Sequence, residues 1–484
     1  MKMKRILTYL ILALVTLVAF SYYFINQYTY KLAEDALSDL EPKIEEWFNK
    51  HTNYKSEKIY ITYDLASVNI FKNIILENIE LRNINDQITL DKLSLKIDNN
   101  NINIKEAVNL DHFVSNVRFE INRFSINDLI LDELLNEDPL SKLVFNDLKV
   151  EDLRFSRKEV DGSIIIEEIG IDNFGNNSLK GQQIKNISLN LPEVKLSIDK
   201  IYLDNFENID SLITVFNNFE IYDDIYELEN SHYQNAMNYY GMNVFSAENI
   251  KTKINFENNN VVDLGIGLIE FNFGRNDKKF KVVDNGFVKI DKLRIPVSIF
   301  EEAINFELYK YILDWNDELI TNYFVSMDAD TNTSSAKYEF NFGVEKLGST
   351  NLNMEIGGYT DDYIINYLED PNYTETEEFL NDITLKAFDF MYIDEGLNEL
   401  VLNEINMPRQ DLQFYFDEMV SYSPWLPSKY KIQLIDAFEN IMAGKNKVTI
   451  QFNSRYPDGI KLTEFDYMTF DNFDRYGDFL IQVE

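Results

Sequence analysis

Residues 74–97 read IILENIELRNINDQITLDKLSLKI, and two parts of this stretch share one spacing of apolar residues. In each part, four apolar residues stand at positions i, i+2, i+5 and i+7 around a polar pair, which is Glu77-Asn78 in the first part and Asp91-Lys92 in the second. The spacing recurs around the pairs 127–128, 146–147, 151–152, 167–168, 199–200 and 291–292, and a ninth copy surrounds 386–387. Because the copies are irregularly spaced along the chain, they indicate a recurring strand device and not a fixed-length repeat.

This spacing decides between helix and strand. At about 100° per residue, the four apolar positions scatter around a helix and form no stripe. In an uninterrupted strand the first two would face one side of the sheet and the last two the other side. A β-bulge at the polar pair returns all four to one face, and a short turn at the pair is the remaining alternative. Both of these predict an antiparallel, curved sheet with one apolar face.

The overall charge argues against nucleic acid as a partner. The chain has 484 residues, with 45 basic and 82 acidic side chains and a net charge of −37, which would repel nucleic acid and anionic lipid head groups. It contains no cysteine, so disulfides, thiolate zinc sites and cysteine nucleophiles are excluded.

The N-terminus predicts a membrane anchor. Three basic residues, Lys2, Lys4 and Arg5, precede an uncharged apolar run over 6–25, which is about as long as a helix needs to cross a bilayer. By the positive-inside rule, the rest of the chain then lies outside the cytoplasm. A cleavable signal peptide is the alternative, with a cleavage site near Ala19-Phe20-Ser21, but the apolar run continues past it and favours the uncleaved anchor.

The chain is expected to have four parts. These are a cytoplasmic stub with the transmembrane helix over 1–30, an amphipathic helix and linker over 31–57, a β-rich domain over 58–325 and an α+β domain over 326–484. Helical spacing of apolar residues predicts helices within 209–240, 297–323 and 361–443. The predicted fold class is therefore mainly β with an α+β C-terminal half, in which a transmembrane helix precedes a curved, bulged antiparallel sheet.

Motifs of catalysis and metal binding are weak. The stretch from Asp328 to Glu339 places oxygen donors as a calcium loop does, but Thr333 stands where such a loop needs glycine, so a polar hairpin turn is the favoured interpretation. The three histidines are far apart, and no nucleophile-elbow, P-loop or dinucleotide motif occurs. We therefore expect a protein that is not an enzyme and that has no metal site and no cofactor.

A family resemblance joins these features. The basic-flanked anchor and the strands ILENIEL (75–81), ITLDKLSL (88–95) and LVFNDLKVEDLRF (143–155) resemble the AsmA-like envelope proteins of Gram-negative bacteria. The stretches 383–402 and 434–453 also look like the C-terminal part of uncharacterised anchored proteins of alphaproteobacteria.

The resemblance implies a single-pass inner-membrane protein with its bulk in the periplasm, which supports the envelope or handles lipid through an apolar groove. The positions expected to face phospholipid acyl chains are Leu76, Ile79, Leu90, Leu93, Ile126, Leu129, Phe145 and Leu148. One alternative is an anchored scaffold that binds another envelope protein without a lipid ligand. A hydrolase that uses two carboxylates is a third hypothesis.

Overall fold

The structure is a computed structural model. It describes residues 31, 35, 38 and 42 and the ranges 60–68, 73–82, 86–98, 101–114, 117–130, 144–157, 162–175, 178–207, 242–255, 261–274, 284–297, 318–369, 377–399, 408–422, 428–467 and 473–484. The four single residues are helical and exposed, as expected for the polar side of the helix predicted within 31–57. The chain divides into two compact units, residues 1–210 and residues 211–484.

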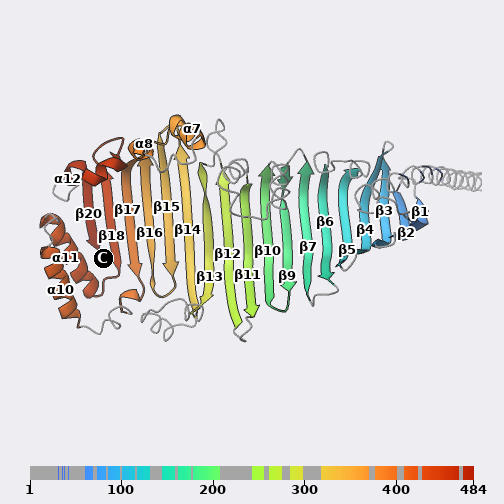
Figure 1. Ribbon diagram of the computed structural model, residues 1–484, viewed down its shortest axis with the longest axis horizontal. Helices are drawn as coiled ribbons and strands as arrows, with labels where there is room; N and C mark the ends of the chain where they lie inside the picture. Colours follow the sequence, from blue (N-terminus) through green and yellow to red (C-terminus); the bar gives the residue numbers. More distant parts are fainter. Residues whose placement is uncertain are drawn as a thin grey trace, which may run out of the picture. The chain divides into compact units, whose positions relative to one another are not determined.

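The elements described between Tyr60 and Glu207 in the first unit are antiparallel strands (Figure 1). They are β1 (Tyr60–Val68), β2 (Asn73–Arg82), β3 (Asp86–Asp98), β4 (Asn101–Val114), β5 (Val117–Ile130), β6 (Phe145–Arg157), β7 (Ser163–Gly175), β8 (Ser178–Lys180), β9 (Gln182–Asn190) and β10 (Val194–Glu207). From β1 to β7 each strand pairs with the next one in the chain, and the three-residue β8 and the longer β9 both pair with β7 on one side and β10 on the other. The unit is thus a β-meander.

The second unit continues the same construction and adds helices. Its strands are β11 (Met242–Asn255), β12 (Val261–Gly274), β13 (Asn285–Pro296), β14 (Glu318–Asp330), β15 (Ser335–Val344), β16 (Gly348–Gly357), β17 (Thr384–Asp394), β18 (Lys447–Ser454), β19 (Ile460–Lys461) and β20 (Gly477–Val483). Its helices are α7 (Asp361–Glu369), α8 (Glu377–Asp382), α10 (Arg409–Ser421), α11 (Ser428–Met442), η3 (Leu462–Tyr467) and α12 (Phe473–Tyr476).

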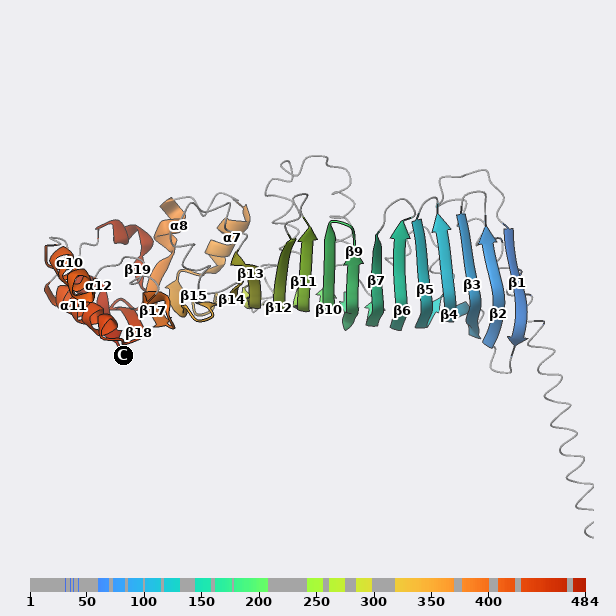
Figure 2. The ribbon, with the colours of Figure 1, turned by 90° about the horizontal axis from the view of Figure 1, so that it is seen from below.

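The helices of the second unit gather at its C-terminal strands (Figure 2). On α7, Ile364 is 2% exposed and packs in one cluster with Ala329 and Ala336 of β14 and β15. On α11, the buried Tyr430 meets Phe479 of β20 edge to face at 5.4 Å between ring centroids. Helices α7 and α11 therefore cover part of the apolar surface of these strands.

The structure confirms part of the predicted fold and corrects one element. The mainly antiparallel β class is confirmed, and helices occur within 361–443 as expected. The helix predicted over 297–323 is wrong in its last part, because 318–323 belong to β14. Most of the rest of that segment and the whole helix predicted within 209–240 lie outside the described residues.

The boundary expected at 325/326 falls inside β14, whereas the two units divide after Asp210. The anchor predicted over 6–25 also lies outside the described residues. Among the residues that are described, no helix has the length and apolar character needed to cross a membrane.

The stretch that resembles a calcium loop is a hairpin turn between β14 and β15. The Asp330 carboxylate accepts hydrogen bonds from the backbone N–H of Asn332 at 2.8 Å and from its side-chain amide at 2.9 Å. Ser334 has a positive φ of 48°, which completes the turn. The hairpin interpretation is confirmed, because β14 and β15 pair on both sides of this turn and Asp330 bonds within it.

Candidate functional site: the apolar face of the first unit

A line of skipped residues crosses the sheet of the first unit. Between β2 and β3, the pairing passes from Glu77 opposite Lys92 to Ile79 opposite Leu90, so the register skips Asn78 on one strand and Asp91 on the other. The same skip occurs at the middle of β4, β5, β6, β7, β9 and β10. We call these residues the bulge line: Asn78, Asp91, Asn109, Asn122, Asp152, Glu167, Asn186 and Asp199.

The bulge line alternates in backbone conformation from strand to strand. Its members on β2, β4, β6 and β9 have a positive φ of 51°, 51°, 52° and 51°, and its members on the intervening strands do not. The four positive-φ residues are Asn or Asp, which adopt the left-handed region more readily than other residues with a Cβ. Because each strand carries one extra residue at the same level, neighbouring strands stay in register on both sides of the line.

Side-chain hydrogen bonds also connect the bulge line. The Asn109 amide donates to Asp91 at 2.7 Å, and the Asn186 amide donates to Glu167 at 2.6 Å. The Asn122 amide donates to Asp152 at 3.2 Å. An amide next to a carboxylate on the adjacent strand thus lets the extra residues of two strands satisfy each other.

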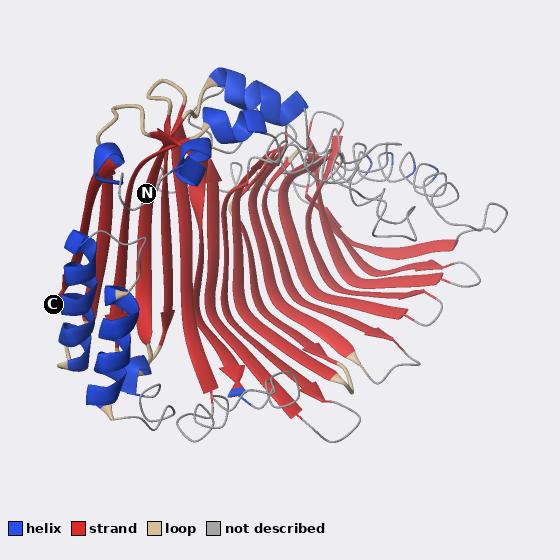
Figure 3. Cartoon of the chain, turned by 60° about the vertical axis from the view of Figure 1, so that its left-hand side comes forward, coloured by secondary structure: helices blue, strands red, loops and turns tan. Residues whose placement is uncertain are grey.

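The bulges place the apolar side chains on one face, which we call the apolar face. One row of paired residues follows the bulge line on one side: Ile79, Leu90, Leu110, Ile121, Leu153, Ile166, Ile187 and Ile198. A second row follows it on the other side: Leu76, Leu93, Ala107, Phe124, Val150, Ile169, Ile184 and Ile201. A bulge with two residues opposite one is confirmed at Glu77-Asn78 against β1 and at Asp291-Lys292 against β14, whereas between β2 and β10 each member of the bulge line stands opposite one residue. The strands are visibly bent along their length (Figure 3).

The apolar face is most accessible toward β6 and β7. Phe155 and Ile164, which pair across these strands, are 40% and 37% exposed. Ile164 pairs in turn with Leu189, and Leu189 pairs with Leu196, and both of these leucines are half-buried. All elements described between Tyr60 and Glu207 are strands, so no described helix from this range packs on the face.

The eight positions predicted to face lipid differ in accessibility. Five are buried, with exposures between 3% and 8%: Leu76, Ile79, Leu90, Ile126 and Phe145. Leu93 and Leu148 are half-buried, and the side chain of Leu129 lies outside the described set. Four of the eight, Leu76, Ile79, Leu90 and Leu93, belong to the two rows beside the bulge line. Ile126 and Phe145 form a buried cluster with Phe174.

The opposite face carries the charged residues. Glu106 pairs with Arg123 across β4 and β5 at 2.6 Å, and Glu168 pairs with Lys185 across β7 and β9 at 2.6 Å. Arg118 pairs with Asp111 at 2.7 Å, and this carboxylate raises the pKa of the guanidinium. The sheet is therefore amphipathic, with cross-strand ion pairs on one face and aliphatic rows on the other.

The ion pair between Glu168 and Lys185 predicts that the stability of the sheet depends on pH. The hydrogen bond from Lys185 lowers the pKa of Glu168 below its ordinary value. Stability from this pair is present above the unfolded-state pKa and is lost as the pH falls through the folded-state pKa. At neutral pH we expect Glu168→Gln to lower the free energy of unfolding by about 0.5–1 kcal/mol, the size of a half-exposed pair.

The difference between wild type and Glu168→Gln should shrink as the pH falls through the lowered folded-state pKa of Glu168, because the wild-type carboxyl is then protonated. Urea unfolding at a series of pH values measures it, with the exposed turn residue Glu193 changed to Gln as the control. A difference that stays constant from neutral pH to acid would show that the charge on Glu168 does not stabilise the sheet.

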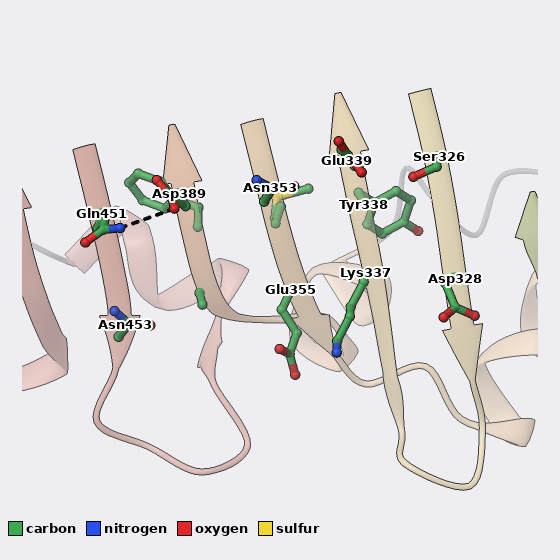
Figure 4. A pocket seen from close by; sticks show the side chains of 13 residues that line it. Ser326, Asp328, Lys337, Tyr338, Glu339, Asn353, Glu355, Asp389, Gln451 and Asn453 are labelled. Atoms are coloured by element: carbon green, nitrogen blue, oxygen red, sulfur yellow. Dashed lines mark hydrogen bonds between the residues drawn. The ribbon is translucent and has the colours of Figure 1, made fainter. Parts of the chain in front are cut away.

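A second candidate site is a polar pocket of about 420 Å³ on the second unit (Figure 4). It lies across β14 to β18, and its polar lining residues are Ser326, Asp328, Lys337, Glu339, Asn353, Glu355, Asp389, Gln451 and Asn453. Gln451 donates a hydrogen bond to Asp389 Oδ2 at 3.2 Å, while Oδ1 of Asp389 is buried without a hydrogen-bond partner in the structure. The pocket could therefore accept a hydrogen-bond donor at this oxygen.

The apolar spacing in the sequence does not indicate every member of the bulge line. Phe119, Ile121, Phe124 and Ile126 have the same i, i+2, i+5, i+7 spacing around Asn122, so this copy could have been found. On β4 both outer positions, Lys105 and His112, are polar, and on β9 one of them is Gln182, so the spacing does not reveal Asn109 or Asn186. Only the pairing of neighbouring strands places these two asparagines on the line.

A scan against protein-family models finds no match to this chain, and a search among curated proteins finds no relative. The AsmA-like resemblance therefore remains a prediction from motifs.

Proposed function

We propose that the protein is a non-catalytic, membrane-anchored envelope protein of AsmA-like type that holds lipid acyl chains on the apolar face of its first unit. The observation that carries this proposal is the partly exposed row on β5 to β10, which joins Phe119, Phe155, Ile164, Leu189 and Leu196 by register. Soluble proteins rarely leave a continuous apolar surface exposed unless it binds something.

In this proposal, the residues that contact lipid differ in part from the eight positions predicted from the sequence. Leu76, Ile79 and Leu90 are too buried for direct contact with a ligand, so they hold the sheet together beneath or beside it. The acyl chains would lie on the more open part of the face, near Phe155 and Ile164. Because the chain carries a net charge of −37, we expect zwitterionic head groups to be preferred over anionic ones.

The full-length protein and two double variants test this function. Phe155→Glu with Ile164→Glu places two charges on the exposed part of the apolar face, and it should remove most of the co-purifying lipid and most uptake from phosphatidylethanolamine liposomes. Charges in contact with acyl chains are strongly unfavourable, since neither group can hydrogen-bond to hydrocarbon. Mass spectrometry of the purified protein measures the bound lipid.

The matched control places the same charges on the opposite face. Ile165 lies between Ile164 and Ile166 on β7 and pairs with Arg154 and Ser188 of the polar face. Ile165→Glu combined with Ser188→Glu should leave lipid binding unchanged. Wild-type protein that carries no lipid and takes up none, or equal losses in both double variants, would rule out the proposed function.

A further inference from the structure

Helix α10 exposes a row of large apolar side chains in the second unit. Phe414 and Tyr415 are each 59% exposed, Met419 is 62% exposed and Tyr422, directly after the helix, is 80% exposed. We call these four residues the α10 patch. Aromatic residues and methionine are enriched at protein interfaces, and they are unusual as neighbours on a free surface.

The other side of α10 is firmly packed. Phe416 stacks on Phe438 of α11 with 4.0 Å between ring centroids, and Val420 is 5% exposed in a cluster with Tyr430. Gln413 also donates a hydrogen bond to Glu439 of α11 at 2.9 Å. The helix therefore uses one apolar side for its own fold and cannot bury the α10 patch by rotating.

The spacing within the α10 patch matches a helix that packs on a second surface. Tyr415, Met419 and Tyr422 stand at i, i+4 and i+7, which places them in one stripe along the helix. Asp411 and Glu418 are exposed on the same side, because they lie four residues before and three residues after Tyr415. The stripe is thus apolar and aromatic with acidic residues beside it.

The charges select among the surfaces that could cover this stripe. Helices that bind at membrane surfaces carry Lys and Arg beside their apolar side, whereas α10 has one arginine and three carboxylates. A second copy of the chain would bring the same acidic residues and the same net charge of −37 to the contact. A protein surface with basic residues beside an apolar groove fits both features of the stripe.

We propose that the α10 patch docks a partner protein by laying its aromatic stripe into an apolar groove lined at its edges by lysine or arginine. This surface is distinct from the apolar face of the first unit and does not depend on lipid binding. If the protein is a scaffold that binds another envelope protein, the α10 patch is the surface that we expect to bind it.

Two synthetic helical-hairpin peptides serve as defined probes of this surface. They share one leucine-lined groove between their two helices and differ only in carrying lysine or glutamate beside it. Fluorescence anisotropy with the full-length protein should show binding of the lysine peptide, and Tyr415→Ser with Met419→Ser should weaken that binding about tenfold or more, as for the loss of central interface residues.

The control variant removes two other exposed apolar side chains, Tyr456 and Val261, which are 48% and 47% exposed. Tyr456→Ser with Val261→Ser should bind the lysine peptide as wild type does, and the glutamate peptide should bind neither protein. Equal binding of the lysine peptide by wild type and the α10 variant would overturn the proposal. It would also be overturned if the α10 variant abolished binding to phosphatidylglycerol vesicles or dissociated a homodimer, since the occupant would then be a membrane or a second copy.

Discussion

Deleting Asp152 should prevent the first unit from folding, whereas replacing it with glycine should have little effect. Asp152 is the extra residue of β6 on the bulge line, and the register passes from Glu151 opposite Glu168 to Leu153 opposite Ile166 around it. Without it, the remainder of the strand slips by one residue, and every side chain beyond the deletion turns to the other face. Arg154 would then stand on the apolar face and Leu153 on the charged one.

The expected loss of folding free energy follows from the exchange of faces by Leu153 and Arg154. Moving an arginine onto an apolar surface and an aliphatic row into contact with ion pairs costs more than about 5 kcal/mol, which is comparable to the whole stability of a domain. Asp152→Gly keeps the residue count and suits the positive φ of 52°, so its free energy of unfolding should change by less than about 1 kcal/mol. Asp152→Val keeps the count but strains the backbone, and it should cost about 1–2 kcal/mol.

Hydrogen exchange of the β5, β6 and β7 peptides checks this order of effects. Protection should be lost in the deletion variant and kept in the other two. A deletion variant with native protection would show that Asp152 does not set the register, and that β6 can repair the pairing elsewhere.

The sequence predicted the bulges because they alter a local pattern. Around Glu77-Asn78 and Asp291-Lys292, the apolar spacing alone required either a bulge, a turn or a sheet buried on both faces. The structure decides for the bulge, with a positive φ of 51° at Asn78 and 53° at Lys292. Which residue of each pair is skipped could not be predicted, because it alternates between neighbouring strands and so depends on their pairing.

Tertiary context explains the other differences. Leu319, Ile320 and Tyr323 have apolar spacing that suits a helix, but β14 is half-buried on both faces, so its apolar residues do not alternate. On α10, the sequence could not separate Phe416 and Val420, which pack inward, from Tyr415 and Met419, which face outward. All four follow one helical pattern, and only the position of α11 distinguishes them.

A single core substitution should destabilise the second unit and leave the first unchanged. Phe452 of β18 is fully buried, and it packs in one cluster with Leu385 and Ile460. Its ring stacks on Phe388 at 5.6 Å between centroids. Phe452→Ala removes these contacts and leaves a cavity, which should lower the free energy of unfolding by about 3–5 kcal/mol.

Urea unfolding, with hydrogen exchange as the readout, measures the loss of stability separately in each unit. The matched control is Phe342→Ala on β15 of the same unit, where the side chain is 40% exposed and the cost should stay below about 1.5 kcal/mol. Equal costs for the two substitutions would contradict the assignment of the core.

The backbone of β20 provides an independent check on this core. Gly477 lies so close to Phe452 that a Cβ at this position would overlap the aromatic ring. Gly477→Ala should therefore destabilise the second unit by about 1–3 kcal/mol, as overpacking does, and Phe452→Ala should relieve that overlap. The double variant should then be more stable than the sum of the two single costs predicts, with an interaction energy of about 1 kcal/mol or more. If the two costs simply add, the overlap comes from the backbone oxygen of Asn453, which also lies close to the position of this Cβ, and not from the ring of Phe452.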